Sequence, residues 1–140
     1  MNSKKPSVLV CVTGQYDCDR LIKAGYEKAK EKNYLLHVLC VHTPVSNVGL
    51  MSEEIEYLYQ TSKDLGADMT ITFSDNAPSC AADFSKKINA KLLITGMPDN
   101  HPNGFVITLH ELLPKLQIIT VTKKNECLTF SLEDTGIDYA

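Results

Sequence analysis

The sequence lacks tryptophan, Cys-x-x-Cys pairs and any uninterrupted apolar run long enough to cross a membrane. Since a membrane-spanning helix needs about 20 predominantly apolar residues, we expect no such span. Positive charge is also scarce, because 14 Lys and Arg residues stand against 17 Asp and Glu residues. Duplex nucleic acid requires a clustered basic face, so nucleic acid binding is not expected. The first residues carry no signal-type cleavage site, and we expect a cytoplasmic protein.

The five cysteines are an odd number and have no metal-site spacing. Disulfide frameworks use even numbers of cysteines and zinc sites use closely spaced pairs, so neither is expected. Cys11 and Cys40 fall inside apolar runs and are predicted to be small core residues. Cys18 and Cys80 lie near predicted helix starts, where the helix dipole lowers a thiol pKa, so a redox role for these two is an alternative.

Apolar runs alternate with amphipathic segments along most of the chain. The runs are rich in β-branched residues and predict strands at 7–12, 35–41, 69–73, 92–95 and 117–121. Strands that alternate with helices form a parallel sheet with right-handed crossovers and helices on both faces. We therefore expect an α/β fold with strand order 3-2-1-4-5, and residues 127–132 are a candidate for an antiparallel sixth strand.

Four helices are expected between these strands. Asp17 is predicted to cap the first, Ser52 to begin the second and Gly66 to end it. The third is predicted to open at residues 76–79, and Pro114 to stop the fourth. The inner faces of the helices are predicted from apolar spacing to hold Leu21, Ile22, Gly25, Ala29, Ile55, Leu58, Ser62, Leu65, Ala81, Phe84, Ile88, Val106, Leu109, Leu112 and Leu113.

A chain of 140 residues fits one domain, with a core over about 5–121 and a C-terminal extension over 122–140. In an open sheet of this order, ligands bind beyond the carboxyl ends of the strands, where the first and fourth strands diverge. The predicted cleft lies between the turn at 13–15, the end of the second strand at 41–43 and the loop at 96–104. Helix N-termini at this edge expose backbone amides to an anion such as phosphate.

Several short motifs, taken in order, resemble the universal stress protein family over roughly residues 5–121. They are VLVCVTG at 8–14, LLHV at 35–38, LGAD at 65–68 and NAKLLITG at 89–96. The CVTG at 11–14 and the RLI at 20–22 look most like the version of the domain in potassium-sensor histidine kinases. The resemblance implies a three-layer Rossmann-like fold of the adenine nucleotide alpha hydrolase type and a binding role in stress response or signalling.

The sequence departs from the pattern of the nucleotide-binding family members. Those members carry an Asp after the first strand, where this chain has Thr13, and a spaced glycine loop after the fourth strand. Gly96 matches the first glycine of that loop, Asp99 replaces the second, and Gly104 falls too early to be the third. A carboxylate at Asp99 would repel a phosphate about 4 Å away by roughly 1 to 4 kcal/mol, so tight triphosphate binding is not expected.

The family resemblance assigns roles by position to residues around the cleft. The backbone of Val41 and its neighbours would meet the base, Thr13 and Gly14 would lie on the ribose side, and the residues on the phosphate side would be Gly96, Asn103, Gly104 and Thr108. Gln15 and His42 are further candidate binding residues of the same cleft. ATP or AMP is then the candidate ligand. Backbone geometry alone also explains the glycines at 14 and 96, and a solvated loop explains His42 and His101.

The alternative function is a ligand-free module that acts by homodimerisation or by docking to a signalling partner. Family members pair through the fifth strand, and an exposed edge strand invites such pairing, so a homodimer is expected. If residues 127–132 cover that edge, the dimer must be built differently. An enzyme is not expected, because the chain has no nucleophile elbow and no histidine pair with metal-site spacing.

Overall fold

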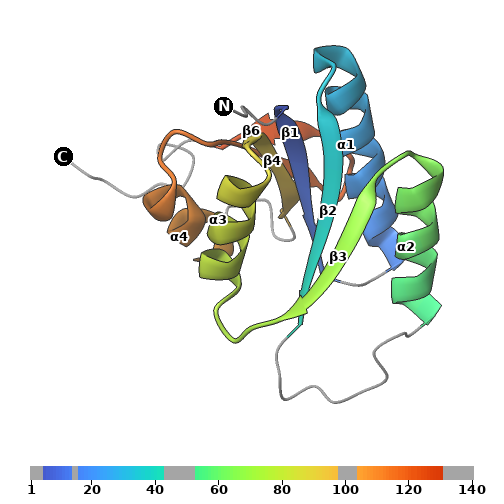
Figure 1. Ribbon diagram of the computed structural model, residues 1–140, viewed down its shortest axis with the longest axis horizontal. Coiled ribbons are helices and arrows are strands. Elements are labelled where there is room, and N and C mark those ends of the chain that lie inside the picture. Colours follow the sequence, from blue (N-terminus) through green and yellow to red (C-terminus); the bar gives the residue numbers. More distant parts are fainter. Residues whose placement is uncertain (1–4, 14–15, 43–52, 98–103, 131–140) are drawn as a thin grey trace.

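The computed structural model describes residues 5–13, 16–42, 53–97 and 104–130 (Figure 1). Its elements in chain order are β1 (Ser7–Val12), the 3-10 turn η1 (Tyr16–Cys18), α1 (Asp19–Lys32), β2 (Leu35–His42), α2 (Glu53–Asp64), β3 (Asp68–Phe73), α3 (Ala77–Lys87), β4 (Ala90–Met97), α4 (Gly104–Leu112), β5 (Gln117–Thr122) and β6 (Cys127–Thr129). The sheet has the order β3-β2-β1-β4-β5-β6. The first five strands are parallel and β6 is antiparallel, as the sequence predicts.

Helices cover both faces of the sheet, with α1 and α2 on one side and α3 and α4 on the other (Figure 1). Every residue of β1 is buried because this strand lies at the centre of the sheet. Its side chains alternate, so that Val10 packs with the α1 and α2 side and Leu9 with the α3 and α4 side. The continuous apolar run at 7–12 follows from this burial on both faces.

Two glycines are required by the backbone and by packing. Gly66 has a φ of 77° and ends α2, as predicted, because an L side chain is strained in that conformation. Gly25 lies where α1 crosses β1, and an added Cβ would clash with Cγ2 of Val10 and lie 3.1 Å from Cδ1 of Leu36. The helix can approach the sheet this closely only because residue 25 has no side chain.

The start of α3 confirms its sequence signal, and the start of α1 does not. Asn76 caps α3, and its Oδ1 accepts a hydrogen bond of 3.1 Å from the amide of Ser79. Asp17 does not cap α1, because the chain enters through the 3-10 turn and the helix begins after Cys18, which makes no side-chain cap bond. The predicted cap Ser52 lies outside the described residues.

The predicted inner faces are largely buried, with one exception in α4. Val106 and Leu109 are fully buried and Leu113 packs against the same cluster. Leu112 is 47% exposed, contrary to the prediction, because the inward stripe continues from Leu109 to Leu113 and leaves Leu112 beside it.

Part of the C-terminal extension joins the sheet. β6 pairs with the outer edge of β5, and Thr120 Oγ1 donates to the carbonyl of Leu128 at 3.3 Å. Phe130 is buried, with its ring 5.3 Å from that of His110 on α4. The edge of β5 is therefore occupied within the chain. None of the described helices is long and apolar enough to span a membrane.

Candidate functional site

A cavity of about 240 Å³ opens where β1, β2 and β4 reach their carboxyl ends. Thr13, Val41 and Thr95 line it from the sheet, and Ala77 and Phe105 line it from the first turns of α3 and α4. Because helices and strands alternate in direction, this edge also carries the starts of the helices. The cavity therefore occupies the switch point at which the strand order predicts a ligand site.

The floor of the cavity is apolar and its few polar groups come from the strand ends. Thr95 is 9% exposed, and its Oγ1 donates to the carbonyl of Cys11 at 3.4 Å. Thr13 is exposed at the rim, with Oγ1 3.6 Å from Sγ of Cys18. An apolar pocket with a few convergent polar groups is the usual form of a small-molecule site.

The structure brings some of the predicted site residues together and separates others. Thr13 and Val41 line the cavity. His42 follows Val41 on the opposite face of the sheet, with Nε2 3.5 Å from Sγ of Cys40 and its ring 6.1 Å from that of Phe73. It does not line the cavity.

The residues predicted on the phosphate side lie near the rim or outside the description. Gly96 faces α1, where an added Cβ would lie 3.7 Å from Cδ1 of Leu21. Gly104 and Thr108 are exposed on α4 and do not line the cavity. Gly14, Gln15 and Asn103 lie outside the described residues, as does Asp99. The binding roles of these residues stay predictions.

Arg20 is a rim residue that the sequence analysis did not assign to the site. Its Nη1 donates to the carbonyls of Val121 and Thr122, at 3.3 Å and 2.9 Å. A Cβ at Gly96 would lie 3.8 Å from its Nη2. The guanidinium therefore crosses the carboxyl ends of β4 and β5, and this cation beside the first loop glycine was missed because the contact joins segments far apart in the chain.

The cysteine thiols near the cavity are held in their neutral form. Burial, followed by the neighbouring Cys80 and Cys40, raises the pKa of Cys11 far above its ordinary value. Burial, followed by Cys18, raises the pKa of Cys40 to about 11. Burial and then Asp83 also raise the pKa of Cys80. This direction is opposite to the lowering of the pKa that a helix start alone would cause, and the redox role of Cys80 stays a prediction.

The remaining polar groups do not add a metal centre to the described part of the chain. His37 is half-buried against the ring of Phe84, with centroids 6.3 Å apart, and burial lowers its pKa although Asp68 acts in the opposite direction. Among the described residues, no three His, Cys, Asp or Glu side chains are placed to hold a metal ion. The site consists of an apolar cavity with hydroxyl groups at its edge.

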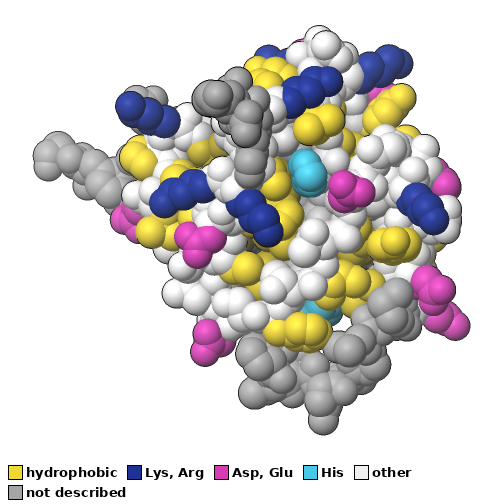
Figure 2. Space-filling view, in the orientation of Figure 1, with side chains coloured by type: hydrophobic (Ala, Val, Ile, Leu, Met, Phe, Trp, Pro, Cys, Tyr) yellow, Lys and Arg dark blue, Asp and Glu magenta, His cyan; other side chains and the backbone are white. Residues whose placement is uncertain are grey.

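Charge is distributed unevenly between the two ends of the sheet. Acidic residues begin α1 and α2, and lysines occur in the last turns of α1, α2 and α3. This pattern complements the helix dipoles. In Figure 2, Lys and Arg side chains gather mainly on the half of the visible face that carries the amino-terminal ends of the strands. On this face, the half with the carboxyl ends of the strands therefore has fewer Lys and Arg side chains to offer a phosphate.

No protein-family model and no curated protein matches the sequence. Solved structures do match the fold. A universal stress protein from Archaeoglobus fulgidus is 13% identical, with a TM-score of 0.63 over 84% of this chain and 93% of that one. A universal stress protein in complex with cAMP is 13% identical, with a TM-score of 0.65 over 86% and 98%. The Archaeoglobus fulgidus protein in complex with dAMP is 13% identical, with a TM-score of 0.60 over 83% and 96%. The chain thus has the Rossmann-like α/β fold of the universal stress proteins.

Proposed function

We propose that this chain is a universal stress protein-like regulatory domain that binds an adenine nucleotide in the cavity at its carboxyl rim. The carrying observation is the position of that cavity, which lies at the switch point and is lined by Thr13 and Val41. Two universal stress proteins of the same fold were solved with cAMP and with dAMP. Both ligands combine an adenine base with one phosphate, which is the class of ligand we propose here.

The size and charge of the site favour a monophosphate. Drug-sized ligands occupy pockets of roughly 300 to 1,000 Å³, whereas this cavity measures about 240 Å³. The base would enter between Val41 and Phe105, and the ribose and phosphate would extend over the rim past Thr13. Arg20 is a described cation at the carboxyl ends of β4 and β5, but it does not line the cavity and its Nη1 is already bonded to backbone carbonyls. A triphosphate would therefore find little compensation for its charge.

We propose a binding role rather than a catalytic one. Cys11 is the nucleophilic side chain among the described residues that line the cavity, and its thiol stays protonated at neutral pH because its pKa is raised. Thr13 and Thr95 contribute hydroxyl groups, and neither is bonded to a described histidine or carboxylate. The cavity offers recognition groups without an activated nucleophile.

The experiment is calorimetric titration with AMP, cAMP and ATP, with GMP as the control for the base. We expect AMP and cAMP to bind more tightly than ATP and GMP. Ala77→Phe places a ring in the cavity from the first turn of α3 and should abolish binding, whereas Asp83→Phe adds the same ring to the exposed face of α3 and should leave it intact. Binding that is equal in both variants would reject the site.

A docking module is the second candidate. The observation that favours it is β6, whose residues are all exposed and whose Leu128 is 44% exposed on the new edge of the sheet. Because β6 occupies the edge of β5, the expected homodimer cannot pair through β5. We propose the outer edge of β6 as the dimer surface instead. Sedimentation of the wild type and of Leu128→Lys tests it, since loss of a dimer in the variant alone would support this candidate. The likeness to the potassium-sensor kinase domain stays a prediction.

A further inference from the structure

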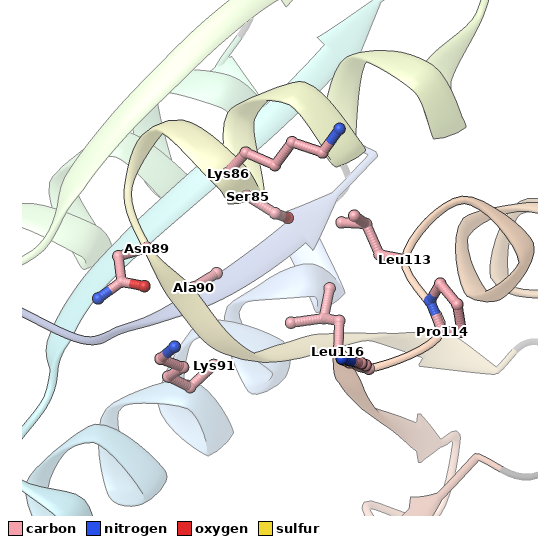
Figure 3. A pocket seen from close by; sticks show the side chains of 9 residues that line it. Ser85, Lys86, Asn89, Ala90, Lys91, Leu113, Pro114 and Leu116 are labelled. Carbon is pink, nitrogen blue, oxygen red and sulfur yellow. The ribbon is translucent and has the colours of Figure 1, made fainter.

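A second, larger cavity lies at the opposite end of the sheet from the candidate nucleotide site. It has a volume of about 370 Å³ and opens between the end of α3, the beginning of β4 and the connection from α4 to β5 (Figure 3). Two turns between helices and strands form it. Asn89 turns the chain from α3 into β4 with a φ of 55°, and Pro114 follows the end of α4. Ala90, Leu113 and Leu116 provide apolar walls.

Ser85 brings an unsatisfied hydroxyl group to this cavity. The residue is 2% exposed, and its Oγ has no hydrogen-bond partner within the described part of the chain. In Figure 3 the hydroxyl points from α3 across the space toward Leu113. The buried Ser62 on α2 behaves differently, because its Oγ donates to the carbonyl of Leu58 at 2.8 Å. Buried hydroxyls are rarely left without a partner, so Ser85 has a hydrogen-bonding group that a bound water or a ligand would satisfy.

Three lysines from three different segments surround the same cavity. Lys86 lies in the last turn of α3, Lys91 lies on β4, and Lys115 follows Pro114 in the connection to β5. The helix dipole accounts for Lys86 alone. No carboxylate of a described residue forms an ion pair with these three, and no Asp or Glu occurs among the described residues that line the cavity. The last carbonyls of α3 carry partial negative charge at this end of the sheet, and the positive charge of the lysines has to outweigh it before an anion is attracted.

We propose that this cavity is a binding site for a small organic anion, in which a carboxylate or phosphate group is carried by a short apolar body. The anionic group would lie at the mouth of the cavity, where the exposed lysine side chains can turn toward it, and the body would pack on Leu113 and Leu116. Oγ of Ser85 is covered in the free protein, and a small movement of this wall would let it donate a hydrogen bond to the anion. Neither the lysines nor the serine alone requires such a ligand. All of them border one apolar cavity, and the exposed lysine side chains are long enough to turn toward its mouth, so together they match both parts of the ligand. The site is independent of the proposed nucleotide cavity, since the two lie at opposite ends of the strands.

The test is titration of the ¹⁵N-labelled chain, followed by NMR, with four probes that separate charge from apolar body. Hexanoate and hexyl phosphate carry both, hexan-1-ol carries the body alone and inorganic phosphate the charge alone. We expect the two amphipathic anions to shift the amides of Ser85, Lys91 and Leu116, and to bind at least about tenfold more tightly than hexan-1-ol or inorganic phosphate. Equal affinity of hexanoate and hexan-1-ol, or shifts confined to other residues, would overturn the proposal.

Variants distinguish a ligand site from a merely solvated set of lysines. The triple variant Lys86→Gln, Lys91→Gln, Lys115→Gln should weaken hexanoate binding at least about tenfold. The control Lys32→Gln, Lys63→Gln, Lys123→Gln removes the same charge from exposed positions away from the cavity and should leave binding unchanged. Ser85→Ala should weaken binding while the free protein keeps or gains thermal stability. Unchanged affinity in both the lysine triple and Ser85→Ala would refute the site.

Discussion

The packing of α1 on β1 makes a prediction in which a normally stabilising substitution should have the opposite effect. Replacing a glycine inside a helix by alanine stabilises it by about 1 kcal/mol. At Gly25, however, the new Cβ would clash with Cγ2 of Val10, a fully buried β-branched side chain on the central strand. Overpacking of a core costs about 1 to 3 kcal/mol. Gly25→Ala should therefore lower the free energy of unfolding by about 0 to 2 kcal/mol.

The double-mutant cycle with Val10→Ala removes the obstructing methyl groups and isolates the cause. In that background Gly25→Ala should become stabilising, by up to about 1 kcal/mol, because the gain in helix propensity is then opposed only by Cδ1 of Leu36, the movable end of a side chain 3.1 Å from the new Cβ. Urea denaturation followed by circular dichroism measures all four variants. If Gly25→Ala stabilises the wild-type protein and the Val10 background equally, α1 does not approach β1 as the structure shows, and the reasoning is refuted.

Two further predictions concern polar groups. Arg20→Met removes the hydrogen bonds to the carbonyls of Val121 and Thr122. It should lower the free energy of unfolding by about 1 to 3 kcal/mol, as measured by urea denaturation. A variant as stable as the wild type would contradict the contribution of these hydrogen bonds to stability. The pKa of His37 is lowered by burial from its ordinary value of 6.5, so the unfolded chain binds the proton more readily. Stability should therefore hold above that value, decrease as the pH falls through it, and level off below the folded pKa. His37→Phe should flatten this part of the stability profile, and an unchanged slope would show that other groups cause it.

The strand order could be predicted from the sequence because a parallel sheet covered on both faces requires continuous apolar runs. The runs at 7–12 and 117–121 carry that signal with little interruption, and their bounds lie close to those of β1 and β5. The cap of α3 was also predictable, since Asn76 and Pro78 act within a single turn. Local chemistry and burial on two faces are both visible in a sequence.

The features that the sequence could not reveal depend on contacts between distant segments or on small local choices. The bond from Arg20 to β5 joins residues about a hundred positions apart, and no periodicity signals it. The 3-10 turn that displaces the start of α1 past Asp17 leaves no distinct pattern either. A cavity at the strand ends was predictable from topology. Its small volume and its apolar lining by Ala77 and Phe105 emerge only from packing.

The larger cavity was not predictable for the same reason. Its lysines are spread over three segments, and in the sequence each is an ordinary surface lysine. Ser85 is equally inconspicuous, because a serine in a helix normally bonds to its own backbone, as Ser62 does. Only the fold shows that these residues border one space.

The most direct test of the central claim is an NMR titration of the ¹⁵N-labelled chain with AMP. We predict saturable shifts of the amides of Thr13, Val41 and Thr95, which line the carboxyl-rim cavity, and no shift at Ser85 or Lys91 at the other end of the sheet. Loss of those shifts in Ala77→Phe would tie them to the cavity itself. Absence of shifts at Thr13, Val41 and Thr95 at saturating AMP, or shifts that appear only at the opposite rim, would contradict the proposed function.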